Sequence, residues 1–159
     1  MATFAEHRKI LKKIEAFKPE LNKIVDAMGV IAKNHFTESF ANQGFTDESF
    51  SPWKKRKRFR DTYKRGKRDE NGIRSMNIDR ALLVKSGRLR RSLRVRRVGS
   101  LGVKILTDVP YASVHNNGER SGRGRGFKMP KRQFIGYSGI MNRKIIAKFD
   151  QKLKMFFNK

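Results

Sequence analysis

The chain has 159 residues, and its 39 lysines and arginines against 14 acidic residues give a formal net charge of +25. The length is that of about one domain, and the lack of cysteine excludes a disulfide framework and a Cys-based zinc site. No apolar run is long enough for a membrane span, no signal peptide is expected, and the charge favours a polyanionic partner, either nucleic acid or an acidic protein surface.

The N-terminal third is predicted to be helical. Its apolar residues recur at spacings of four and three: Ile10, Ile14, Phe17, Leu21, Ile24, Met28 and Ile31. Because proline lacks an N–H and restricts the residue before it, Pro19 predicts two helices, over 3–17 and 19–42. Gly44 is the expected left-handed cap. The heptads also fit a two-stranded coiled coil, but the proline favours a helix packed on its own domain.

Residues 54–80 are predicted to form a basic loop insert. Its first fifteen residues, 54–68, contain ten basic side chains and one acidic one, so the segment repels itself. Phe59 and Tyr63 fit either stacking on bases or anchoring of the loop on its own domain. The candidate contacts to DNA or to an acidic partner in this segment are Lys54, Lys55, Arg56, Lys57, Arg58, Arg60, Lys64 and Arg65.

The second half changes to strand periodicity. After a short helical turn, strands are expected over 92–98 and through 101–105, joined at Gly99, with a third over 111–115. Alternation on the first strand places Arg94 and Arg96 on one face, as further candidate contacts.

A Gly/Arg-rich loop is expected over 116–130, followed by a last helix over 139–157. Arg123 and Arg125 in this loop fit either tracking of a phosphate backbone or a solvated surface loop. The predicted fold is a single α+β domain over 1–159, with N-terminal helices and a C-terminal helix packed on a small, mainly antiparallel β-sheet, and with long basic loops.

Catalytic motifs are nearly absent. The three histidines are far apart, no carboxylate pair stands out, and the glycine loop lacks the strand and helix that a nucleotide-binding loop needs. His115 followed by two asparagines resembles part of a His-Asn nuclease motif, but a polar end of a strand is the simpler interpretation. We therefore expect no enzyme, no cofactor and no metal.

Three segments, in order, resemble the phage virion morphogenesis family, the tail completion proteins of tailed phages, including Mu-like ones. Residues 82–93 resemble its L-x-x-S/T-G-x-L-x-x-S segment, residues 111–118 its YA-x-x-H-x-x-G, and residues 130–136 its P-x-R-x-F-I/L-G, with a tryptophan upstream. The positions that match are Trp53, Ser86, Gly87, Leu89, Ser92, Tyr111, His115, Gly118, Pro130, Arg132 and Phe134.

Physical chemistry gives several of these positions a role. Ser86 is expected to cap following N–H groups, and Gly87 to supply a backbone angle that a side chain forbids. Tyr111 and Phe134 fit anchors for a core or for a subunit contact, and Arg132 fits a bidentate pair with a neighbour's carboxylate. Packing within the domain is the alternative for all of them.

The resemblance implies a structural virion protein, made in the bacterial host cytoplasm and located in the neck or tail end of the virion. Such a protein is expected to complete the tail, to join it to the head and to form a ring around the DNA channel, with six copies favoured over twelve. Its expected partners are copies of itself, neighbouring connector and tail proteins and, through non-specific phosphate contacts, packaged DNA. The alternative is a free basic nucleic-acid-binding module of the ribosome- or nucleoid-associated type.

Overall fold

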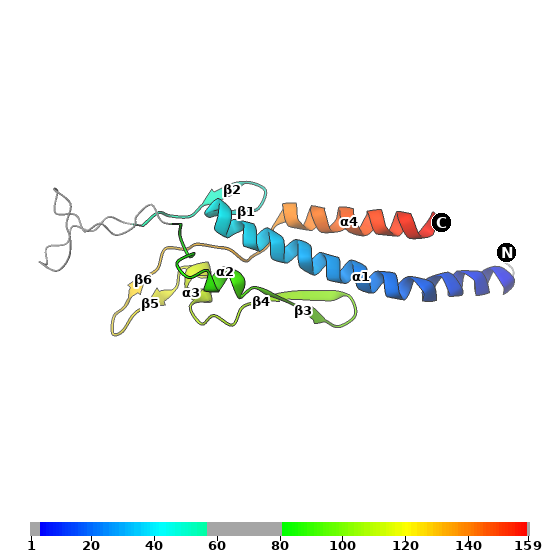
Figure 1. Cartoon of the computed structure of the whole chain (residues 1–159), viewed down its shortest axis with the longest axis horizontal. Helices are drawn as coiled ribbons and strands as arrows, with labels where there is room; N and C mark the ends of the chain where they lie inside the picture. Colours follow the sequence, from blue (N-terminus) through cyan, green and yellow to red (C-terminus); the bar gives the residue numbers. More distant parts are fainter. Residues whose placement is uncertain (1–3, 57–80, 159) are drawn as a thin grey trace, which may run out of the picture.

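The computed structural model describes residues 4–56 and 81–158, which form helices and short antiparallel hairpins (Figure 1). The helices are α1 (Phe4–Asn42), α2 (Arg88–Arg91), α3 (Ala112–Asn117) and α4 (Gly139–Phe157). The strands pair as β1 (Gly44–Thr46) with β2 (Phe50–Pro52), β3 (Arg94–Val98) with β4 (Gly102–Leu106), and β5 (Arg120–Ser121) with β6 (Phe127–Lys128). The predicted α+β class is confirmed, and within the described residues the strands form three separate hairpins.

The predicted break at Pro19 is wrong, because α1 runs through this residue as one helix. A proline inside a helix loses one backbone hydrogen bond and costs about 3 kcal/mol. Ending the helix at Pro19 and starting a second one leaves several carbonyl and N–H groups unpaired at each new end. A helix that continues through the proline therefore costs less free energy than two separate helices.

The helix ends at Asn42, as predicted, but its left-handed cap lies one residue earlier than expected. Gln43, not Gly44, takes the left-handed conformation, with φ of 56°. Its side-chain amide bonds the carbonyl of Phe40 and, through its oxygen, the N–H of Leu82. Gly44 begins β1, where a Cβ atom would lie 2.6 Å from the carbonyl oxygen of Ser51, so its lack of a side chain serves strand pairing.

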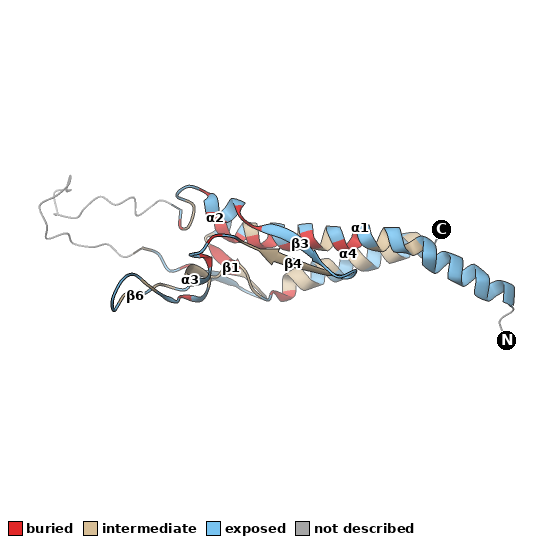
Figure 2. Ribbon diagram, turned by 90° about the horizontal axis from the view of Figure 1, so that it is seen from below, coloured by how far each residue is buried: buried red, intermediate tan, exposed pale blue. Residues whose placement is uncertain are grey.

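The apolar core lies at the C-terminal half of α1, and the N-terminal half is exposed (Figure 2). The Phe40 ring is central, with its centroid 5.6 Å from that of Trp53 and 5.1 Å from that of Phe134. The buried cluster comprises Ala32, Phe36, Phe40, Phe45, Trp53, Leu82, Leu89, Leu93, Val109, Ala112 and Phe134. The predicted apolar stripe is therefore only partly used, since Ile10 and Ile14 remain about half exposed.

The β3–β4 hairpin confirms the first two predicted strands and their connection, with Gly99 at φ of 62°. It lies along α1, where Val95 comes so close to Gly29 that a Cβ atom there would be 2.4 Å from the valine methyl. Arg97 holds the same face of the hairpin against α1, because its Nε lies 2.9 Å from an Asp26 carboxylate oxygen and its Nη2 donates to the carbonyl of Asn22.

The last helix, α4, confirms the prediction and runs beside α1 (Figure 1). Ser138 caps it by accepting from the Met141 N–H at 3.2 Å, and the Gly139 N–H donates to Asp47 Oδ1 at 2.7 Å. At the other end, the rings of Phe17 and Phe156 lie 5.0 Å apart. The two ends of the described chain consequently lie at the same end of the molecule, opposite the β5–β6 hairpin (Figure 1).

Two further predictions need correction. The strand expected over 111–115 is the helix α3, which Gly118 ends at φ of 74° while its N–H donates to the carbonyl of Val114. A proline suits the start of a helix as well as that of a strand, so Pro110 did not discriminate between them. The loop expected over 116–130 contains the β5–β6 hairpin.

Candidate nucleic-acid and partner interface

The segments singled out in the sequence meet in space beside Trp53. The indole Nε1 donates to the carbonyl of Gln133 at 2.7 Å, and the backbone N–H of Arg132 donates to the carbonyl of His115 at 2.7 Å. Residues 130–136 thus lie between the β2 end and α3. The matching residues form one structural unit, mostly by packing within the chain.

Arg132 is used inside the protein. The side chain is buried, and its Nε and Nη2 donate to the carbonyl oxygen of Lys54 at 3.2 and 3.0 Å. Burial, and then the nearby charge of Arg56, lower the pKa of the guanidinium from its ordinary value. The guanidinium that was expected to pair with a neighbour's carboxylate instead donates both hydrogen bonds to a backbone oxygen of its own chain.

Phe134 is a core residue, with 1% of its surface exposed. Its backbone N–H and that of Ile135 both donate to the side-chain oxygen of Asn116, each at 3.0 Å. Sequence reasoning missed this role of Asn116, which stood out only as one of the two asparagines that follow His115. A single asparagine thereby ties α3 to the segment that leads into α4.

The segment around α2 has its predicted local geometry. Ser86 Oγ accepts from the Arg88 N–H at 3.3 Å, and Gly87 has φ of 68°. Leu89 is buried, and Ser92 Oγ bonds the carbonyl of Leu89 and the hydroxyl of Thr107. These interactions tie the end of α2 to Thr107, the residue that follows β4.

The middle segment is more open to solvent. Tyr111 is 40% exposed, and its ring meets the edge of the half-buried His115 ring at 5.9 Å. Gly118 is buried, and a Cβ atom there would lie 3.0 Å from the backbone nitrogen of Lys131, so the two segments approach closely. Pro130 is half-buried just before this contact.

The predicted cationic contacts on the β3–β4 hairpin point away from α1. Since Val95 and Arg97 face α1, alternation places Arg94 and Arg96 on the outward face, and both are exposed. Arg96 pairs in register with Lys104, which adds a third cation to this face. Arg94 lies 3.5 Å from Asp108 in an exposed ion pair, which leaves the face net positive.

The remaining basic candidates divide into two groups. Lys54, Lys55, Arg123 and Arg125 are exposed and Arg56 is half-buried. Lys57, Arg58, Arg60, Lys64 and Arg65 lie outside the described residues. The exposed arginines of the β5–β6 hairpin therefore form a second cationic surface, distinct from the β3–β4 face.

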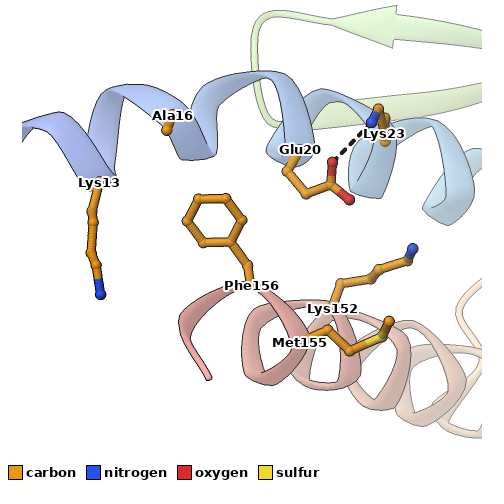
Figure 3. Close-up of a pocket in the computed structure, with 7 residues that line it drawn as sticks. All are labelled: Lys13, Ala16, Glu20, Lys23, Lys152, Met155 and Phe156. Carbon is orange, nitrogen blue, oxygen red and sulfur yellow. Dashed lines mark ion pairs between the residues drawn. The ribbon is translucent and has the colours of Figure 1, made fainter. Parts of the chain in front are cut away.

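A cavity of about 540 Å³ opens between the N-terminal half of α1 and the end of α4 (Figure 3). Phe156 points from α4 toward α1 there, and Glu20 forms an ion pair with Lys23 at 3.0 Å. Lys13 and Lys152 add positive charge. None of the residues predicted from sequence lies in this cavity.

No group of three or more His, Asp or Glu side chains among residues 4–56 and 81–158 is arranged to hold a metal ion. None of the helices described there has the length and apolar character that crossing a membrane requires.

Comparison with known proteins gave one informative match. A sequence model of the phage virion morphogenesis family matches residues 3–154, nearly the whole chain. No curated protein and no solved structure matched the chain. The matched range includes all three segments that meet beside Trp53. The chain therefore belongs to the phage virion morphogenesis family, and its role lies in the structure and assembly of the phage particle.

Proposed function

We propose that this protein completes the tail and joins it to the head in the neck of a tailed phage, as a ring of identical copies around the DNA channel. Six copies are favoured over twelve. The observation that carries the proposal is the outward cationic face of the β3–β4 hairpin in a member of a virion family. A neck component lies beside the path of packaged DNA, and sequence-independent phosphate contacts need only exposed cations.

A ring explains how such a small surface suffices. In a closed ring each copy repeats the same head-to-tail contact, so a modest patch is used many times. The outward arginines of successive copies would then line a lumen or face an acidic connector. The chain offers this charge on short hairpins held by α1 and by the apolar core.

Loss of the protein from an infecting phage tests the neck role. We expect electron micrographs of the lysate to show DNA-filled heads and separate tails, and we expect supplied wild-type protein to restore joined, infectious particles. Normal joined particles in its absence would contradict the proposal. So would a complete lack of tails, since the protein would then act in earlier tail assembly.

The DNA contact is tested by the salt dependence of duplex binding. Arg94→Gln with Arg96→Gln should reduce the slope of log K against log salt by about 2, since each phosphate contact contributes about 0.9. Lys9→Gln with Lys12→Gln on the exposed start of α1 removes the same charge and is the matched control. Equal slopes in the two double variants would place the contact elsewhere. Tight binding by a stable monomer, with no head–tail defect in the phage, would favour a free nucleic-acid-binding module.

A further inference from the structure

The helices α1 and α4 meet near the end of α4 through an aromatic contact. The Phe17 ring lies 5.0 Å from that of Phe156 and 5.5 Å from that of Phe157. On the N-terminal side of Phe17, every residue of 4–16 is exposed. This stretch is about 20 Å long at the rise of an α-helix, and it extends past the end of α4 (Figure 2). One face of α1 therefore continues where α4 stops.

The face that continues is apolar. Ile10 and Ile14 precede Phe17 by seven and three residues, so their side chains lie on the face of α1 that contacts α4. Both are about half exposed, and Met155 and Phe157 are exposed in the same way at the end of α4. Single exposed apolar residues are normal, but a group that two helices bring to one end of the molecule marks an interaction site.

The cavity between the two helices lies beside this apolar group and adds positive charge. Ala16, Met155 and Phe156 give it apolar walls. Lys13 extends from α1 and Lys152 from α4, on either side of the Phe156 ring (Figure 3). Among residues 4–56 and 81–158, neither lysine has a hydrogen-bonding or ion-pair partner.

The charge of the cavity lining is net positive. Its acid, Glu20, pairs with Lys23 at 3.0 Å, which leaves Lys13 and Lys152 to act on an incoming group. An anionic group is attracted to these two lysines, and the apolar walls favour an apolar side chain between them. The surface therefore suits an occupant with an apolar face and acidic edges.

A second copy of this chain does not supply such an occupant. If two α1 helices pack in antiparallel directions with Ile10 against Ile14, Lys13 of one copy lies beside Lys13 of the other. If they pack in parallel directions, Lys13 lies beside Lys18. Like charges at these flanking positions repel, so an acidic partner is favoured over self-pairing.

We propose that the open end of the α1–α4 pair docks an acidic amphipathic helix of a neighbouring virion protein. The helix lies along Ile10 and Ile14, in line with α4, and one of its apolar side chains enters the cavity beside Phe156. Carboxylates at the edges of its apolar face pair with Lys13 and Lys152. A helix fits because α4 already packs on this face of α1, and a helix in line with it continues the same side-chain packing. Only the source of the helix rests on the proposed function.

The first test uses the isolated full-length protein and a synthetic helical peptide. The peptide carries leucines at helical spacing along one face and glutamates at both edges of that face, and a matched peptide has lysine in place of every glutamate. We expect saturable binding of the glutamate peptide by fluorescence anisotropy at constant ionic strength. The lysine peptide should bind at least about tenfold more weakly, since like charges oppose the contact. Equal affinities of the two peptides would overturn the proposal.

The apolar part of the surface is tested by Ile10→Ser with Ile14→Ser. This double variant should weaken binding of the glutamate peptide by about tenfold or more, because apolar area is no longer buried. Val98→Ser with Leu101→Ser is the matched control, since these side chains are equally exposed on the β3–β4 hairpin. Similar losses in both double variants would mean that the peptide binds elsewhere.

The charged part is tested by Lys13→Gln with Lys152→Gln. The affinity for the glutamate peptide should fall and become less dependent on salt. Arg123→Gln with Arg125→Gln removes the same charge from the β5–β6 hairpin and should leave the affinity unchanged. Equal effects of the two double variants would show that the net charge of the protein, and not this site, attracts the peptide.

The partner is identified by a photo-crosslinking amino acid at position 14 in infecting phage. We expect a crosslink in assembled particles to one segment of another virion protein, and we expect its sequence to be apolar at helical spacing with acidic edges. A crosslink to a second copy of this chain would overturn the assigned partner, and tighter binding to phosphatidylglycerol vesicles than to the glutamate peptide would favour a membrane surface instead. If no segment is crosslinked while head–tail joining still requires the protein, the docking site is refuted and the neck role stands. A crosslink to an acidic helix of a virion protein outside the neck would support the site and contradict the neck role.

Discussion

Asn116 provides the sharpest test of how the fold is held together. Its side-chain oxygen accepts two backbone N–H groups, those of Phe134 and Ile135, each at 3.0 Å in a partly buried setting. Asn116→Ala leaves both donors without their acceptor. Each unsatisfied, partly buried donor costs about 1–1.5 kcal/mol, so the free energy of unfolding should fall by about 2–3 kcal/mol.

In a chain of this length, that loss corresponds to a decrease in Tm of about 5–10 °C. Urea denaturation followed by circular dichroism measures the free energy, and a thermal scan measures Tm. Asn116→Asp is the matched control, because it keeps an acceptor oxygen of the same geometry and loses only the exposed bond to Asn117. Its stability should lie within about 1 kcal/mol of the wild type.

Either of two results would refute this reasoning. Equal losses in the alanine and aspartate variants would mean that the oxygen is not the important atom. Wild-type stability of Asn116→Ala would mean that water replaces the side chain at no cost.

Three further predictions concern packing, titration and capping. Gly29→Ala should lower the free energy of unfolding by about 1–3 kcal/mol despite the better helix propensity of alanine, since the new methyl group meets Val95. Adding Val95→Ala should recover part of the loss. No recovery in urea denaturation would contradict the contact. Because the pKa of His115 is lowered in the folded protein, the unfolded chain takes up a proton near pH 6.5 before the native ring does, and the free energy of unfolding should fall as pH decreases through 6.5. The fall should be smaller in His115→Gln. An unchanged pH profile in this variant would argue against the effect. Asp47→Ala removes the acceptor of the Gly139 N–H and should cost about 0.5–2 kcal/mol by thermal denaturation, whereas an unchanged Tm would show that water caps this helix equally well.

The sequence predicted the regular elements well where periodicity is strong. The hairpin at Gly99 and the C-terminal helix follow from alternation and from four-residue spacing, and both are confirmed. Pro19 misled the prediction because a local rule ignores the cost of creating two new helix ends. At 111–115 the segment is too short for either period to dominate.

The site was harder to predict, since its contacts join distant parts of the chain. Arg132 bonds a backbone carbonyl 78 residues away, and a backbone acceptor leaves no signature in side-chain identities. The Nδ1 atom of His115, which makes no hydrogen bond to any residue in 4–56 or 81–158, likewise owes its state to what packs around it. The motif positions were visible in the sequence, but their mutual geometry was not.

The placement of the two chain ends gives the subunit a polarity that an experiment can exploit. Both ends lie at one pole, and the β5–β6 hairpin lies at the opposite pole (Figure 1). A bulky reporter fused to either terminus would therefore mark the same pole and leave the other unobstructed. Imaging such tagged particles would reveal which pole of the subunit faces the head, independently of any mutation in the binding surfaces.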